Sequence, residues 1–270
     1  MNRERKRLVL LSVVTMLFFC VGGYGVYRFL QHEKYQNAKI SQLQGDVSLL
    51  KEELKLFTNR EIVEYSDTAF NYLAIGNSIT KHDICDYWWN EIGMAASTED
   101  KDYVHLLSNS LENRHEDVFT YAYNFYIWEA QSTDRAETLE LLEPYLDSML
   151  NLVTIQLSEN VSNMDTFEKD FAELVNYVHE KAPKAQIVII DDFWDNGDKS
   201  IIKERIATEH GLQFVDLDEI KGKLSYQCGL GTIVYDADGS LHKVEHDGVA
   251  VHPGDLGMKY IADAVMETID

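Results

Sequence analysis

The chain is poor in proline, cysteine and basic residues. It has 3 prolines and 3 cysteines in 270 residues, and 24 lysines and arginines stand against 46 aspartates and glutamates. None of the prolines lies inside an expected strand, and no low-complexity segment or internal repeat is present. The cysteines are too few for a disulfide framework. Cys85 and Cys228 could pair in an oxidising compartment, and the alternative is two free thiols.

The shortage of basic residues is uneven along the chain. The formal net charge is −22, but residues 1–30 sum to +4, which leaves about −26 for the remainder. A domain this acidic repels phosphate backbones and anionic lipid headgroups, so we expect no nucleic-acid partner. The charge favours a substrate that is neutral, cationic or made of small polar units.

The first 30 residues predict a signal anchor. A basic tail at residues 1–7 precedes an apolar run at 8–30, and about 20 apolar residues match a hydrocarbon core of roughly 30 Å. Basic residues before the run favour a cytoplasmic amino terminus and place the rest of the chain outside the cell. A cleaved signal peptide is the alternative, although the run is long for one. We therefore expect a single-pass protein of the cell membrane with an extracellular domain.

Residues 31–66 predict a helical stalk. Their apolar positions alternate by three and four residues, as in a coiled coil: Ile40, Leu43, Val47, Leu50, Leu54 and Phe57. So short a seam is marginal in water, but tethering in a membrane raises the effective concentration of a partner helix and favours a homo-oligomer. The alternative is a single amphipathic helix that folds back on the globular domain.

Residues 67–270 alternate between short apolar strands and helices. The expected strands are 70–75, 118–123, 152–157, 185–190 and 212–215, and the expected helices are 101–115, 131–149, 165–182, 198–210 and 255–269. This alternation predicts an α/β domain in which helices cover both faces of a five-stranded parallel sheet. Asp238-Gly239, between β-rich flanks at 231–245, predicts a hairpin.

Four polar residues lie where such a sheet binds ligands, near the carboxyl ends of its strands. Ser78 follows the first strand and Asn160 the third, whereas Asp247 and His252 precede the last helix. A nucleophilic serine needs a base, the base needs an acid to fix its tautomer, and an amide N–H can stabilise an oxyanion. Taken singly, each residue has a commoner explanation as a helix cap, a turn residue or an exposed loop side chain.

Together, these motifs resemble the SGNH/GDSL hydrolase superfamily over residues 67–270. The resemblance implies a flavodoxin-like three-layer sandwich. It also implies that Ser78 is the nucleophile, that its own amide and Asn160 stabilise the oxyanion, and that His252 is the base and Asp247 the acid. Three further stretches resemble a bacterial, membrane-anchored subgroup: Asp86-Tyr87-Trp88-Trp89, Gly93-Met94-Ala95-Ala96-Ser97 and His252-Pro253-Gly254-Asp255.

Two blocks depart from the family pattern in residue type. Asn77 stands before the serine, where the family usually has Asp. In the third block, Ser158 replaces a glycine and Val161 replaces an aspartate. These changes leave Ser78 and Asn160 in place.

The last block departs in spacing. Asp247 and His252 are five residues apart, whereas the family usually has three, so a Ser–His dyad is the alternative to a triad. The glycine that usually follows the second strand and supplies a backbone oxyanion donor is also missing. The segment from Asn124 to Tyr126 is our candidate for that donor.

All four tryptophans follow expected strands: Trp88, Trp89, Trp128 and Trp194. Flat aromatic faces at that edge suit sugar rings and acyl chains, so we expect these side chains to bind substrate. The alternative is that they pack the rim of the domain.

Two acidic groups invite comparison with metal sites. One is the loop beside Trp194: Asp191, Asp192, Asp195 and Asp198. The other follows Ser78: His82, Asp83 and Asp86. The loop lacks the spaced ligands and closing glutamate of a calcium site, and the second group favours a pocket wall. We expect neither a metal nor a cofactor.

The sequence predicts a serine esterase that removes O-acyl groups, with acetyl favoured, from carbohydrate outside the cell. A lipid esterase is less favoured, because no long apolar lid follows residue 67. Two alternatives stay open. One is a non-catalytic module that binds glycan or assists assembly. The other is an O-acyltransferase that uses the same serine.

Overall fold

The computed structural model describes residues 63–131, 133–194 and 197–269, together with residues 32, 34, 36, 39, 40, 42 and 43. The chain divides into two compact units, Met1–Val47 and Ser48–Asp270. In the first unit the described residues are helical and exposed, among them Ile40 and Leu43 of the expected seam. The other seam positions and the expected anchor at 8–30 lie outside the described residues. No helix within the described part is long and apolar enough to cross a membrane.

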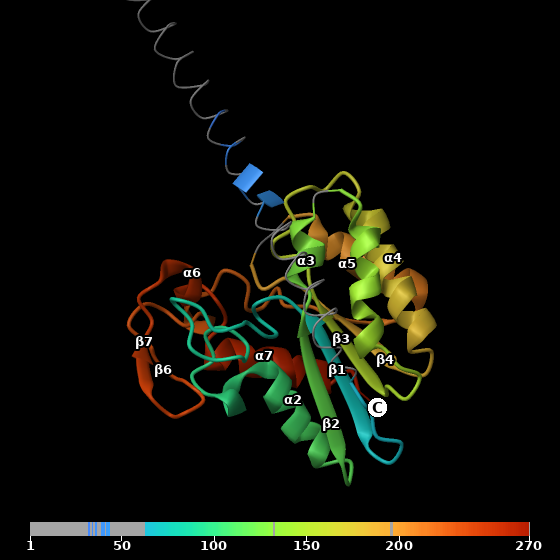
Figure 1. Ribbon diagram of the computed structural model, residues 1–270, viewed down its shortest axis with the longest axis horizontal. Coiled ribbons are helices and arrows are strands. Elements are labelled where there is room, and N and C mark those ends of the chain that lie inside the picture. Colours follow the sequence, from blue (N-terminus) through green and yellow to red (C-terminus); the bar gives the residue numbers. More distant parts are fainter. Residues whose placement is uncertain are drawn as a thin grey trace, which may run out of the picture. The chain divides into compact units, whose positions relative to one another are not determined.

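Five parallel strands form the central sheet of the second unit, in the order β2-β1-β3-β4-β5 (Figure 1). They are β1 Phe70–Gly76, β2 Val118–Asn124, β3 Leu152–Gln156, β4 Gln186–Ile190 and β5 Gln213–Val215. Each strand end lies within one residue of the predicted end. This order is the flavodoxin-like one, in which the strand order reverses beside β1. The predicted five-stranded parallel sheet is confirmed.

Helices cover both faces of the sheet (Figure 1). One face packs on α2 (Tyr103–Glu112) and α7 (Asp255–Met266), and the other on α4 (Phe167–Lys181) and α5 (Lys199–His210). Neighbouring side chains of a strand point to opposite faces. In β1, Tyr72 and Ala74 therefore join the first core, whereas Leu73 and Ile75 join the second.

The segment expected as a helix over 131–149 has a different form. A short helix, α3 (Tyr126–Ala130), comes first, and a 3-10 helix, η2 (Arg135–Tyr145), follows it. Pro144 lies near the end of η2 and has no N–H with which to continue a helix. The remaining short 3-10 helices are η1 (Glu99–Lys101) and η3 (Leu224–Tyr226).

The expected hairpin over 231–245 is confirmed. Strands β6 (Ile233–Tyr235) and β7 (Leu241–Lys243) pair antiparallel around a turn in which Gly239 has a φ of 80°. After the hairpin, the short helix α6 (Asp247–Ala250) leads into α7. The chain thus returns to the carboxyl edge of the sheet just before its last helix.

The two described cysteines do not form a disulfide. Cys85 lies in the loop after β1, where its backbone pairs with that of Trp88. Cys228 follows η3, and burial raises the pKa of its thiol. The structure therefore has the two free thiols that were the alternative to a bond.

Candidate active site

Ser78 stands on a tight turn directly after β1. Gly76 ends the strand, and a Cβ on this residue would lie 1.8 Å from Thr80 Oγ1 and 2.9 Å from the Gln156 carbonyl oxygen. Only glycine fits that space. The side chain of Asn77 then accepts a hydrogen bond from the Ile79 amide at 3.0 Å, which closes the turn. Ser78 itself is half-buried at the edge of the sheet.

His252 reaches the serine from the loop between α6 and α7. Its Nε2 lies 2.8 Å from Ser78 Oγ, and its Nδ1 lies 2.6 Å from the Gly248 carbonyl oxygen. A carbonyl only accepts, so Nδ1 carries the proton and Nε2 is the acceptor for the serine hydroxyl. The His252 backbone is held by the Cys228 amide, which donates to its carbonyl at 2.9 Å. This arrangement allows His252 to act as a base towards Ser78.

The surroundings of His252 keep it neutral. The pKa of this imidazole is lowered from 6.5 to about 4, mainly by burial and also by the nearby His82 and His246, against the opposing effect of the Gly248 carbonyl. The unprotonated form, which can accept a proton, is therefore the main form of the free protein at neutral pH.

Asp247 does not occupy the place of a triad acid. Its carboxyl group is exposed on the first residue of α6, and the Nδ1 proton of His252 goes to the backbone of Gly248 instead. The five-residue spacing accommodates this helical turn, which brings the carbonyl four residues before His252 against the ring. The geometry matches the Ser–His dyad that was the alternative to a triad.

Asn160 lies in the loop after β3 and is tied to a buried carboxylate, Glu129 of α3. Asn160 Nδ2 donates to Glu129 Oε2 at 2.8 Å, and its backbone amide lies 3.4 Å from Oε1. The same Oε1 accepts from the Ser158 amide at 2.6 Å and from Asn77 Nδ2 at 3.1 Å. Burial raises the pKa of Glu129, and these hydrogen bonds oppose the rise. One carboxylate thus joins the loops after β1 and β3.

A second polar group lies beneath the same loop. We call Ser158, Asp192, Lys199 and Lys203, which are all buried, the lysine–aspartate cluster. Lys203 Nζ donates to Asp192 Oδ1 at 2.6 Å, Lys199 Nζ donates to the Ser158 carbonyl at 2.7 Å, and the Ser158 hydroxyl also donates to Asp192. Ser158 has a φ of 117°, a conformation that favours glycine. The hydroxyl bond to Asp192 offsets part of that strain.

The segment from Asn124 to Tyr126 was the candidate for the second oxyanion donor, but its N–H groups already have acceptors. The Phe125 amide donates to the Gly76 carbonyl at 2.6 Å, and the Tyr126 amide donates to the Asn124 side chain at 2.9 Å. Asn124 Nδ2 donates to the Lys81 carbonyl at 2.8 Å. These donors are already in use. By contrast, the backbone amide of Ser78 donates to no acceptor within the described part of the chain.

The four tryptophans separate into core and surface positions. Trp88 and Trp128 are fully buried, so the prediction that they bind substrate is wrong. Trp89 stacks on His242 of β7 at 4.4 Å between ring centroids and helps hold the hairpin. Trp194 alone lies against the reactive residues. Its ring meets the His252 imidazole edge to face at 4.9 Å, and its Nε1 donates to the Val251 carbonyl at 3.0 Å.

Further aromatic residues lie near His252, among them His82, for which the sequence favours a pocket wall. Tyr87 is 38% exposed and stacks on His246 at 4.3 Å between ring centroids, and His82 approaches the same tyrosine at 6.4 Å. His82 and His246 are both close enough to depress the pKa of His252. They come from segments more than 160 residues apart, so only folding brings them together.

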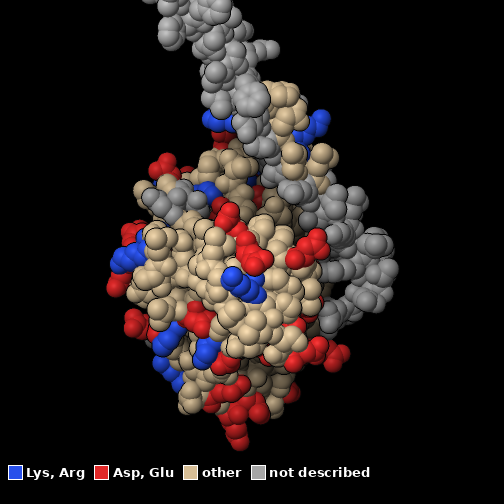
Figure 2. All heavy atoms as spheres, turned by 90° about the vertical axis from the view of Figure 1, so that its left-hand side faces the viewer, with Lys and Arg blue, Asp and Glu red and all other residues tan. Residues whose placement is uncertain are grey.

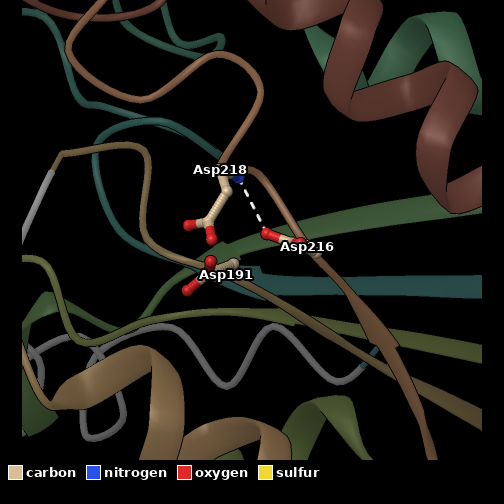
Figure 3. A group of neighbouring side chains, drawn as sticks. All are labelled: Asp191, Asp216 and Asp218. Carbon is tan, nitrogen blue, oxygen red and sulfur yellow. Dashed lines mark hydrogen bonds between the residues drawn. The ribbon is translucent and has the colours of Figure 1, made fainter.

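Figure 3 shows the only group within the described residues whose carboxylates converge like metal ligands: Asp191, Asp216 and Asp218. The Asp218 amide donates to Asp216 Oδ1 at 2.7 Å. Lys221 Nζ donates to Asp191 and, at 2.8 Å, to Asp218 Oδ1. The Lys221 ammonium group already contacts two of these three carboxylates, and we assign them no metal. Of the acidic loop considered from the sequence, Asp195 lies outside the described residues.

Comparison with known proteins finds likeness in structure only. No protein-family model matches the sequence, and no curated protein matches it. An extracellular lipase from Streptomyces rimosus has a TM-score of 0.48 at 15% identity, over 74% of this chain and 100% of that one. A two-domain esterase active on acetylated mannans has a TM-score of 0.47 at 18% identity, over 74% of this chain and 48% of that one. A protein described as a GDSL-like lipase, from Parabacteroides merdae, has a TM-score of 0.46 at 17% identity, over 76% and 97%.

Proposed function

We propose that the second unit is a serine esterase of the SGNH/GDSL type that works with a Ser–His dyad. The observation that carries this proposal is the 2.8 Å contact between Ser78 Oγ and His252 Nε2, with Nδ1 of the same ring held by the Gly248 carbonyl. A nucleophile, a base in the correct tautomer and a group that orients the base are thereby present together.

The proposed reaction has two halves. Ser78 Oγ attacks the ester carbonyl while His252 Nε2 takes the hydroxyl proton. The resulting oxyanion accepts hydrogen bonds from the Ser78 amide and from Asn160 Nδ2. The intermediate collapses, the C–O bond to the alcohol breaks, and His252 returns its proton to the alcohol oxygen. Water then attacks the acyl-serine with the same proton transfers and releases the carboxylic acid.

We propose a neutral, acylated carbohydrate as the substrate, with acetyl as the favoured acyl group. Acidic side chains gather at the lower end of the face shown in Figure 2, and the net charge of −22 disfavours polyanions. Trp194 and the stacked Tyr87–His246 pair place aromatic surface beside His252, as suits the apolar face of a sugar ring. An extracellular location on a membrane anchor, and self-association through the stalk, remain proposals from the sequence.

The test uses the purified full-length chain in detergent, with a nitrophenyl acetate ester and acetylated oligosaccharides as substrates. Ser78→Ala should abolish the release of acetate and leave the melting temperature within a few degrees of wild type. Hydrolysis that survives this change would contradict the proposal. Transfer of acetyl to a sugar acceptor in preference to water would identify an acyltransferase. Glycan binding without any turnover would identify a non-catalytic module.

A further inference from the structure

We propose that Glu129 is a positioning residue that fixes the side-chain amide of Asn160 with its N–H groups, not its oxygen, towards the oxyanion. The proposal rests on the proposed function, because it gives the Glu129 carboxylate a role in that reaction. Glu129 is separated from Asn160 by 31 residues and belongs to α3, the short helix that follows β2. Its exposed fraction is 1%, so it does not meet substrate itself.

Glu129 is the acceptor in each of the hydrogen bonds described here. Its two oxygens accept from four N–H groups: Asn77 Nδ2, the Ser158 amide, the Asn160 amide and Asn160 Nδ2. Within the described part of the chain, Glu129 donates a hydrogen bond to no partner. An ionised carboxylate matches four donors, whereas a protonated one would turn an O–H towards one of them. The site is therefore built for the anion, despite its burial.

The contact at Oε2 determines which way the Asn160 amide faces. Asparagine has one end that donates and one that only accepts, and the two have nearly the same shape. An acceptor 2.8 Å from Nδ2 requires the nitrogen at that place. The second Nδ2 hydrogen is then left for the oxyanion. With the amide turned over, the Asn160 oxygen would face the developing negative charge and oppose the reaction.

The same carboxylate explains the residue before the nucleophile. Asn77 Nδ2 donates to Glu129 Oε1 at 3.1 Å. An aspartate at position 77 would bring a second carboxylate to this oxygen, and two such groups at hydrogen-bond distance do not both stay ionised. The amide at Asn77 and the acid at Glu129 therefore fit each other.

The variant Glu129→Gln separates positioning from folding. Its side-chain oxygen can replace Oε1 and keep the bonds from Asn77 and Ser158. Its NH2 group then replaces Oε2 and meets Asn160 Nδ2 donor to donor. We expect kcat to fall by roughly 10²-fold, the order of loss for one oxyanion donor. KM should stay within about threefold of wild type, because the contact matters in the transition state.

A double variant provides the readout that a purely structural role would not give. Asn160→Ala should lower kcat by a similar factor. If Glu129 acts through Asn160, then Glu129→Gln combined with Asn160→Ala should be no slower than the slower single variant, because the two changes remove one interaction. If the two losses multiply, or if Glu129→Gln keeps the wild-type kcat, the proposal is wrong.

Asp170→Asn is the matched control. Asp170 is also a buried carboxylate, but it accepts from Arg135 at 2.7 Å and from Thr166 at 2.6 Å under a different part of the fold. It should lower the melting temperature without changing kcat.

If Glu129→Gln does not fold, Glu129→Asp keeps the charge but draws it back from Asn160, and the same comparison with Asn160→Ala applies. Ser78→Ala serves as the reference. If it retains activity, both proposals fail, whereas its inactivity alongside an unimpaired Glu129 variant overturns only this one.

Discussion

The oxyanion side and the base side of Ser78 differ in the charged groups that surround them. On the oxyanion side, the loop that carries Asn160 lies over buried ionisable groups, namely Glu129 and the lysine–aspartate cluster. On the base side, His252 meets a backbone carbonyl and the edge of Trp194, and Asp247 is exposed. Fixed charges thus set the oxyanion loop in place, whereas the base lies in a poorly solvated setting without a carboxylate on Nδ1.

This difference indicates where the transition state gains its stabilisation. A carboxylate beside Nδ1 would raise the pKa of an imidazole and favour its charged form. His252 lacks that partner and has a pKa lowered to about 4. Within the described part of the chain, the imidazolium that forms during attack is therefore stabilised through Nδ1 by the Gly248 carbonyl and by no carboxylate. We infer that the oxyanion side supplies more of the stabilisation than it would in a triad.

Removal of the base should have the largest effect. His252→Ala leaves Ser78 with no group to take its proton, and we expect kcat to fall by about 10⁴-fold or more. Steady-state hydrolysis of a nitrophenyl acetate ester measures this, and far-UV circular dichroism checks the fold. A fall of less than tenfold would mean that another group takes the proton.

Disruption of the lysine–aspartate cluster should have the largest effect on stability. Lys203→Met removes the ammonium group that pairs with Asp192 at 2.6 Å, and the loss of one member of a buried pair costs about 3–5 kcal/mol. Urea unfolding measures the free energy of unfolding. Lys181→Met is the control, because Lys181 pairs with Glu143 at the surface and should change stability by under about 1 kcal/mol. If both changes lower the free energy of unfolding equally, the buried cluster is no more important for stability than the surface ion pair, and this prediction is wrong.

The pH dependence of stability and of activity should be set by the titration of His252. Between pH 6.5 and about 4 the unfolded chain binds a proton on His252 that the folded chain excludes. This contribution to the free energy of unfolding is complete above pH 6.5 and is lost as the pH falls through that window, on the order of 3 kcal/mol. His252→Ala should remove this part of the pH dependence, as urea unfolding at several pH values would show. The wild-type kcat/KM should likewise decline near pH 4, and a decline near pH 6.5 would contradict the lowered pKa.

The smallest effect should come from Asp247. Because its carboxyl group is exposed and the Gly248 carbonyl takes the Nδ1 proton, Asp247→Asn should change kcat by no more than about twofold. A fall of about 10⁴-fold, as for loss of a triad acid, would restore Asp247 to that role. The kinetic assay used for His252→Ala decides between them.

The sequence predicted the sheet well, because buried parallel strands are apolar runs such as Ala185–Ile190 that need no long-range information. The resemblance to the SGNH/GDSL superfamily implied that Ser78 and His252 act together, and the structure brings Ser78 Oγ to 2.8 Å from His252 Nε2. Glu129 escaped notice because its role depends on contacts from two other loops. The amide at Asn77, where the family usually has Asp, is the sequence signal that could have pointed to an acid partner.

The errors also have physical causes. Position after a strand does not tell whether a side chain turns outward or into the core, and Trp128 turns inward against Phe167 and Phe171. Asp247 was assigned from the family resemblance, but it is the first residue of α6 and its carboxyl group is exposed. Both errors arose where tertiary structure, rather than local pattern, decides the direction of a side chain.

The most direct test of the account is covalent labelling of Ser78 by a fluorophosphonate, mapped by mass spectrometry of the peptide that contains it. We predict one adduct, on Ser78, in the wild-type protein and at an equal rate in Asp247→Asn. The adduct should be absent from Ser78→Ala and should form far more slowly in His252→Ala. A folded wild-type protein that carries no adduct on Ser78 would contradict the assignment of a His252-activated nucleophile.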